Sequence, residues 1–244
     1  MMIPSSRAER IARAKAYPFG HPADSYLFRE GAAVALENVA TAIRGRVPVL
    51  ASGSNAAPDQ LARKYAAHPD TVIPVTRARL RDFDSVFNAH IAAYGSVPAT
   101  LFPSPGTVLQ TFITWLDAAA LDIMHGTEQP GINYHFAALD GIEVTVDGLG
   151  PLDQAHAYIS VVGCLVHDDA PVALADVPAE GRRFPARSQE DMLALVCDLT
   201  AAGGGVDDFI LETVGDAGLR AARSARLAET ARPFAHPGFR ILEV

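Results

Sequence analysis

The stretch that decides the fold is Val47-Pro48-Val49-Leu50-Ala51-Ser52-Gly53-Ser54-Asn55, an apolar run that stops at Ser-Gly-Ser-Asn before a helical pattern over 56–67. Val and Leu favour a buried strand, and Gly53 lets the backbone turn close to a ligand without a Cβ in the way. Ser54 or Asn55 can cap the helix that follows. The stretch therefore predicts a strand, a tight turn and a helix N-terminus, whose backbone N–H groups attract a carboxylate or an oxyanion.

Two stricter templates do not fit this turn. No Lys follows it, as a phosphate-binding loop requires, and Ser54 is not the central residue of a G-x-S-x-G motif. Many strand-to-helix turns carry Gly, Ser and Asn for capping alone. By itself the stretch therefore fits a purely structural turn as well as a binding turn.

Composition indicates a globular protein. The 244 residues are 49% hydrophobic, and the formal net charge of −8 argues against nucleic-acid binding, which needs clustered Lys and Arg. The first residues lack the unbroken apolar core of a secretory signal, and no stretch approaches the apolar length of a membrane span, so we expect a cytoplasmic protein without membrane association. Cys164 and Cys197 lie in apolar runs, which predicts buried thiols in preference to a disulfide or a metal pair.

Periodicity along the chain predicts one α/β domain of the α+β kind. The pattern favours a mixed sheet of roughly six strands that curves into a small β-barrel with surrounding helices. Helices are predicted over 5–16, 29–44, 56–67, 117–124, 188–199 and 217–232, with a further helix starting at Asp207 and Asp208. Strands are predicted over 71–75 with 78–80, 85–91, 98–102, 108–116, 132–137, 142–146 and 155–166, with a turn at 103–106 and a loop over 167–187.

Glu128 is the candidate acid/base group. We expect it in a loop after the 117–124 helix, facing the 53–57 turn across the open end of the barrel. A carboxylate near apolar walls has its pKa raised by desolvation, which lets it move protons near neutral pH. A carboxylate opposite N–H donors suits attack of an amine on a carbonyl. The alternative for Glu128 is an ordinary solvated loop carboxylate.

The histidines do not indicate a metal site. None of the five central ones shows the H-x-x-x-H or H-x-E spacing of a zinc site, and no Cys pair accompanies them: His90, His125, His135, His156 and His167. A Ser-His-Asp hydrolase with Ser54 as nucleophile ranks behind the acid/base hypothesis, because the strained elbow that such a nucleophile needs is missing. The sequence predicts no metal.

Four stretches carry a resemblance to a known family. They are Ser52-Gly53-Ser54-Asn55 after a strand, Val86-Phe87-Asn88 with 98–106 and the strand to Leu116, the segment Leu121 to Glu128, and the helix around 192–197. In this order they resemble the gamma-glutamylcyclotransferase-like family over roughly residues 46–212. The resemblance implies a cyclotransferase-like barrel domain over 46–212. The segments 1–45 and 213–244 are then helical extensions, for which a lid and a homodimer contact are equally open roles.

The resemblance also implies an activity. Members of the family act in glutathione metabolism and convert a γ-glutamyl amide to 5-oxoproline and a free amine, a lyase or acyl-transfer reaction within the substrate that needs no cofactor and no metal. On this resemblance Ser52, Gly53, Ser54, Asn55 and Ala56 hold the glutamyl group, and a glutamate is general base and then acid. Removing such a base typically costs a factor of about 10² to 10⁴ in rate.

The chain departs from the family pattern at three positions. Ser52 and Met192 stand where tyrosines are usual, and His125 takes the place of the glutamate in Leu-Asp-x-x-Glu-Gly. Spacing favours His125 for the catalytic position, whereas chemistry favours Glu128, the nearest downstream carboxylate. These departures keep a second hypothesis open, a non-catalytic small-molecule-binding or interaction protein on the same fold.

Overall fold

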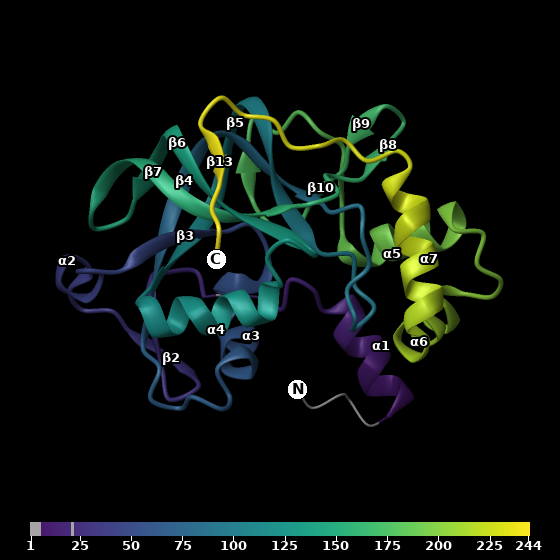
Figure 1. Ribbon diagram of the computed structural model, residues 1–244, viewed down its shortest axis with the longest axis horizontal. Coiled ribbons are helices and arrows are strands. Elements are labelled where there is room, and N and C mark those ends of the chain that lie inside the picture. Colours follow the sequence, from purple (N-terminus) through teal and green to yellow (C-terminus); the bar gives the residue numbers. More distant parts are fainter. Residues whose placement is uncertain (1–5, 21) are drawn as a thin grey trace.

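Five strands close into a mixed β-barrel, as the sequence predicts. The computed structural model describes residues 6–20 and 22–244. The barrel consists of β3 (Val47–Ala51), β4 (Ile73–Phe87), β5 (Ala99–Leu116), β6 (Tyr134–Val146) and β7 (Gly150–Ser160). The order is β5-β3-β7-β6-β4, and pairing of β4 with β5 closes the ring (Figure 1). β3 and β7 are parallel and the other neighbours are antiparallel, so the predicted fold class is confirmed.

Helices lie at two places around the barrel. α3 (Pro58–Lys64) and α4 (Ala118–Glu128) lie against one end of it, while four helices form a separate group at one side (Figure 1). These four are α1 (Arg7–Lys15), α5 (Gln189–Leu199), α6 (Val206–Gly215) and α7 (Ala217–Ala228). Lys15 of α1 pairs with Glu190 of α5 and Asp207 of α6, so helices from the two ends of the chain are joined.

Shorter elements extend this core. β1 (Tyr26–Arg29) and β2 (Ala32–Ala35) form a hairpin beside β4, α2 (Val39–Ala42) precedes β3, and β13 (Phe239–Ile241) pairs with β6. Five two-residue strands lie between β7 and α5: β8 (Val166–His167), β9 (Ala170–Pro171), β10 (Ala173–Leu174), β11 (Ala179–Glu180) and β12 (Ala186–Arg187). The segments 1–45 and 213–244 thus each supply a strand to the sheet as well as helices; the domain division itself stays a prediction.

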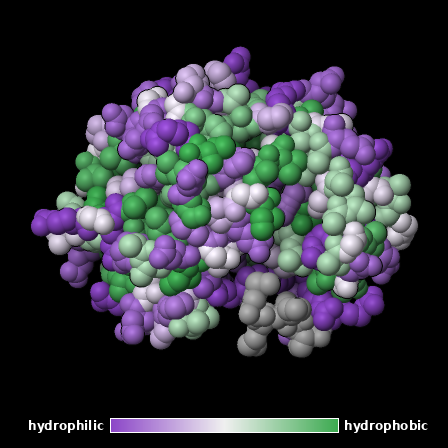
Figure 2. Space-filling view, viewed as in Figure 1, coloured by the Kyte–Doolittle hydropathy of each residue, from purple (hydrophilic) through white to green (hydrophobic). Residues whose placement is uncertain are grey.

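Apolar residues of alternating strand positions fill the barrel, where Leu80, Leu101, Leu109, Ile113 and Leu139 are fully buried. A second cluster lies between the barrel and α3 with α4 and contains Leu61, Tyr65, Leu116, Met124 and Tyr158. Cys164 and Cys197 are free, buried thiols, as predicted. The face shown in Figure 2 mixes hydrophilic and hydrophobic residues. Among the described residues no helix is both long and apolar enough to span a bilayer.

The predicted helix over 29–44 is wrong. The segment forms the β1–β2 hairpin and then the short α2, because Glu30 and Gly31 have φ of 51° and 77°. Two successive residues with positive φ make the tight turn that matches the twist of antiparallel strands. Tyr26 and Phe28 point into the second cluster, which fixes the face that the hairpin buries.

The predicted turn at 103–106 is also wrong, and three pairs of predicted strands are the single long strands β4, β5 and β6. β4 and β5 stay paired along most of their length, with a register shift between Arg81 and Phe83. Asp82 has φ of 64°, and its carboxylate accepts a 2.6 Å hydrogen bond from the N–H of Gly106. The prolines therefore lie at a bulge that bends both strands without ending them.

Helix ends differ from the prediction in detail. Ser6 caps α1 with a capping box closed by Glu9, while Ser5 of the predicted helix lies outside the described residues. The predicted 56–67 helix is a 3₁₀ turn over Ser54–Ala56 followed by α3, which starts at Pro58. Neither Ser54 nor Asn55 caps it. Ser188 caps α5 by accepting from the N–H of Asp191, as predicted, and the last helix ends at Ala228 instead of 232.

Candidate functional site

At the 52–56 turn, carbonyl oxygens at both ends accept hydrogen bonds from side-chain hydroxyls, whereas three backbone N–H groups have no acceptor in the described part of the chain. Three neighbouring hydroxyls donate to carbonyls at its two ends: Thr111 to Ala51, Ser85 to Ser52 and Tyr26 to Ala56. Among the described residues, the backbone N–H groups of Gly53, Ser54 and Asn55 have no acceptor. These three residues are half-buried. A fixed backbone with free, partly desolvated N–H groups is suited to bind a carboxylate or a developing oxyanion.

Gly53 permits a close approach by Tyr17. A Cβ on Gly53 would overlap the hydroxyl of Tyr17 and lie 3.3 Å from the Cβ of Ala99. The same hydroxyl accepts a 2.7 Å hydrogen bond from the N–H of Ala99, at the start of β5. Tyr17, which lies in the segment after α1, is therefore held against the turn by this hydrogen bond.

Glu128 is the last residue of α4 and not a loop residue, which corrects the prediction. The helix runs through Gly126, and Gln129 ends it with φ of 53° and an N–H bonded to the carbonyl of His125. The Glu128 carboxylate accepts a hydrogen bond from the ammonium of Lys64, the last residue of α3. Their side chains are only 13% and 7% exposed. Glu128 is thus a buried, ion-paired carboxylate and not a solvated one.

Tyrosine side chains surround this ion pair. Burial raises the pKa of each of five tyrosine hydroxyls, and the negative charge of Glu128 raises it further: Tyr17, Tyr65, Tyr94, Tyr134 and Tyr158. All five hydroxyls are therefore neutral near pH 7, and that of Tyr65 already donates to the carbonyl of Ala120. Tyr17 also contacts Gly53, so the field of Glu128 reaches the residue that lies against the turn.

His125 lies one helical turn before Glu128 and points at the same cluster. Its Nδ1 is 2.8 Å from the hydroxyl of Tyr158, and its ring packs edge-on against Phe136 at 4.7 Å between centroids. Burial lowers the pKa of His125. Tyr158 is thus hydrogen-bonded to His125, and the negative charge of Glu128 raises the pKa of its hydroxyl. Both candidates for the catalytic position therefore act on the same tyrosine.

The sequence prediction named the turn and Glu128 but not the residues that contact them. Lys64 and Tyr17 are missing from the predicted site. Lys64 lies 64 residues before Glu128 in the sequence, and no local pattern links either residue to the site. Ser52 and Ala56 lie in the turn as predicted, with their carbonyl oxygens already occupied. Among the described residues no group of three or more His, Cys, Asp or Glu side chains is placed to hold a metal ion.

Comparison with known proteins adds weak structural likenesses. No family model matches the chain, and no curated protein matches its sequence. One similar solved structure is that of a protein named "Gamma-glutamyl cyclotransferase"; it is 13% identical, and the match covers 81% of this chain and 94% of that one at a TM-score of 0.38. At this identity the likeness concerns the fold alone.

Two further structures are similar at the same level. An uncharacterized protein from Homo sapiens is 14% identical over 82% of this chain and 95% of its own, with a TM-score of 0.37. A solution structure from Arabidopsis thaliana is 14% identical over 48% of this chain and 70% of its own, with a TM-score of 0.36. Likenesses with scores this low assign no role to any residue of the 52–56 turn or of α4.

Proposed function

We propose that the protein is a cyclotransferase-like enzyme that releases 5-oxoproline and a free amine from a γ-glutamyl amide, with Glu128 as general acid/base. We further propose that it acts in the cytoplasm, within glutathione metabolism. The observation that supports the proposal is a turn whose N–H groups at 53–55 have no acceptor in the described part of the chain, on a barrel that also carries the buried carboxylate of Glu128.

In the proposed reaction the substrate supplies its own nucleophile. Its neutral α-amine attacks its γ-carbonyl carbon, the five-membered ring closes, and the bond to the departing amine breaks. Glu128 accepts the proton that the attacking nitrogen loses and returns it to the leaving nitrogen, so no water is consumed. The N–H groups of Gly53, Ser54 and Asn55 hold the oxyanion that forms on the carbonyl oxygen.

Lys64 has a supporting role in this scheme. Its ammonium compensates the charge of Glu128 in a region where both side chains are withdrawn from water. An unpaired carboxylate at such a place would cost several kcal/mol. Neutral tyrosine hydroxyls around the pair can donate to the oxygen atoms of a bound glutamyl group.

The test is formation of 5-oxoproline from a panel of γ-glutamyl amides. We expect Glu128→Gln to lower kcat/KM by a factor of about 10² to 10⁴, since the amide accepts from Lys64 but takes up no proton. The matched control is Glu143→Gln, at an exposed glutamate of β6 that pairs with Arg81 at the surface, and we expect it to leave the rate unchanged. Equal losses in both variants would contradict the assignment of Glu128.

A second candidate function has its own supporting observation. On the resemblance, His125 takes the place of the glutamate in Leu-Asp-x-x-Glu-Gly, and its ring contacts Tyr158 and Phe136. On that ground the chain would bind a γ-glutamyl compound without converting it. Product formation by the unchanged protein excludes this alternative, whereas tight binding of a γ-glutamyl amide without product supports it.

A further inference from the structure

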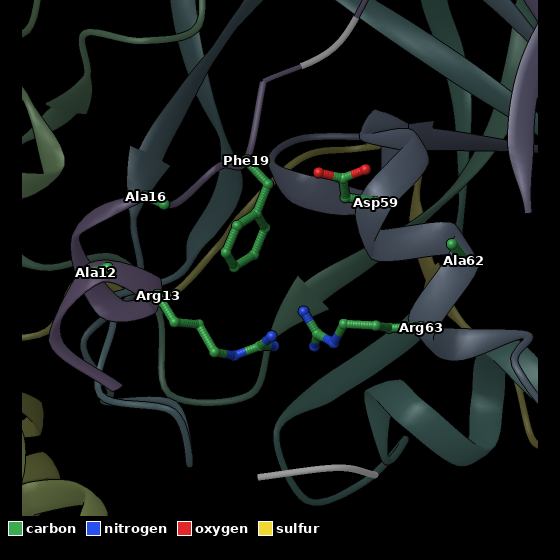
Figure 3. Close-up of a pocket in the computed structure, with 7 residues that line it drawn as sticks. All are labelled: Ala12, Arg13, Ala16, Phe19, Asp59, Ala62 and Arg63. Atoms are coloured by element: carbon green, nitrogen blue, oxygen red, sulfur yellow. The ribbon is translucent and has the colours of Figure 1, made fainter. Parts of the chain in front are cut away.

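Two arginines face each other across a cavity outside the candidate site. The cavity of about 510 Å³ lies between α1 and α3. Its lining residues are Ala12, Arg13, Ala16, Phe19, Asp59, Ala62 and Arg63. Figure 3 shows the guanidinium groups of Arg13 and Arg63 extending toward one another below the ring of Phe19. None of the lining residues belongs to the 52–56 turn or to the Glu128–Lys64 pair.

The two guanidinium groups contact the same aromatic ring. The Cζ of Arg13 is 5.4 Å and that of Arg63 5.8 Å from the centre of the same Phe19 ring, and Arg13 also lies 4.8 Å from the centre of the Tyr94 ring. Two positive charges that contact one ring repel each other, most strongly where the solvent is partly excluded. Burial lowers the pKa of Arg63, which indicates that its charge is partly desolvated.

Neither arginine has a carboxylate partner among the described residues. Elsewhere in the chain Arg79, Arg182 and Arg223 each pair with an acidic side chain. In contrast, Nη2 of Arg13 is buried and has no hydrogen-bond partner within residues 6–20 and 22–244. A buried, charged donor without an acceptor is costly, and native proteins rarely retain one without a reason. Asp59 lines the same cavity, yet in the described part of the chain no ion pair joins it to either arginine.

We propose that this cavity binds a small, doubly charged oxyanion through the guanidinium groups of Arg13 and Arg63. Two planar forks that have no acceptor within residues 6–20 and 22–244 match the oxygen atoms of a phosphate group or of a dicarboxylate, and two negative charges would offset the repulsion between them. The volume suits a small molecule, and Phe19 with the three alanines offers an apolar wall for the rest of it. The cavity borders the candidate site at Tyr94 but shares neither the 52–56 turn nor the Glu128–Lys64 pair.

The experiment is a calorimetric titration of the full-length protein with inorganic phosphate, with succinate and with acetate as a singly charged reference. We expect saturable binding of phosphate or succinate and much weaker binding of acetate. Phosphate and succinate in separate titrations show which oxyanion the site prefers. No saturable binding of either dianion would overturn the proposal.

Variants connect binding to the two arginines. Arg13→Gln and Arg63→Gln each remove one charged donor group, and we expect each to weaken dianion binding roughly tenfold or more. The matched control is Arg44→Gln, which removes the same charge at an exposed position after α2 and should bind as the unchanged protein does. Equal weakening in all three variants would mean that dianion binding depends on net charge alone, and it would contradict the proposed site.

A conservative variant guards against loss of folding. Arg63→Lys keeps the charge but not the planar fork, so we expect a folded protein with affinity between that of the unchanged protein and that of Arg63→Gln. Glu128→Gln should bind the dianion normally, which separates this site from the catalytic proposal. If Arg63→Lys and Arg63→Gln bind as tightly as the unchanged protein, the arginines serve packing on Phe19 and Tyr94 alone.

Discussion

At the scale of single residues, the candidate site contains a buried ion pair between Glu128 and Lys64. Removing one partner of a buried ion pair strands the other, which typically costs about 3–5 kcal/mol. Glu128→Gln keeps an acceptor for Lys64, whereas Glu128→Ala would not. Loss of activity in the glutamine variant can therefore be assigned to proton transfer and not to collapse of the pair.

Gly53 gives a prediction about packing at the turn. The Cβ of an alanine at this position would overlap the hydroxyl of buried Tyr17. We expect Gly53→Ala to lower the free energy of unfolding by about 1–3 kcal/mol, as overpacking does, and to reduce activity. Urea unfolding measures the change.

A second glycine is the matched control. Gly126 lies inside α4 with no atom within 4 Å of its added Cβ, so Gly126→Ala should raise stability by up to about 1 kcal/mol through helix propensity. Removing the Tyr17 hydroxyl in a Gly53→Ala/Tyr17→Phe double variant should return part of the loss. A Gly53→Ala protein as stable as the unchanged one would show that Tyr17 is free to move away.

At the scale of elements, α4 carries the candidate groups and begins at a well-defined cap. Asp117 accepts a 2.9 Å hydrogen bond from the N–H of Ala120 and pairs with Arg46 at 3.1 Å. We expect Asp117→Ala to lower the free energy of unfolding by about 0.5–2 kcal/mol. Asp122→Ala, at an exposed position inside the same helix, should leave the free energy of unfolding nearly unchanged. Denaturant unfolding measures both variants, and an equal decrease in stability would contradict the cap assignment.

The elements also show what the sequence could and could not predict. Asp117 and Ser188 are predictable as caps because a cap is a local arrangement of a side chain and nearby amides. The β1–β2 hairpin is not, since its apolar spacing also fits a helix and Glu30 gives little sign of a positive φ. The continuity of β4 and β5 past Pro103 depends on Asp82 bonding to Gly106 from another strand, which no single segment reveals.

The same distinction holds for the candidate site. The amide-rich turn could be predicted because strand, glycine and helix follow one another within about ten residues. Glu128 could be predicted as a candidate, but its Lys64 partner and the tyrosines around it come from segments that only the closed barrel brings together. Burial of Glu128 is a property of that assembly and not of residues 121–128.

At the scale of the whole molecule, the barrel joins the helical group where the chain leaves β4. The N–H of Ile91 bonds to the hydroxyl of Ser224 on α7 at 3.1 Å, and Nε2 of His90 is buried there without a partner among the described residues. Burial, with the positive charge of Arg220 nearby, lowers the pKa of His90 from 6.5 to about 4. His90 is therefore neutral in the folded protein at neutral pH.

This contact makes the stability of the molecule depend on pH. Between about pH 6.5 and 4 the unfolded chain binds a proton at His90 and the folded chain does not, so stability falls as the pH falls, by up to about 3 kcal/mol across the interval. Urea unfolding at several pH values should show a shallower fall for His90→Gln than for the unchanged protein. His68→Gln, at an exposed histidine, should keep the original slope. Identical slopes in all three proteins would mean that His90 takes up its proton equally in both states and that α7 docks without excluding it from water.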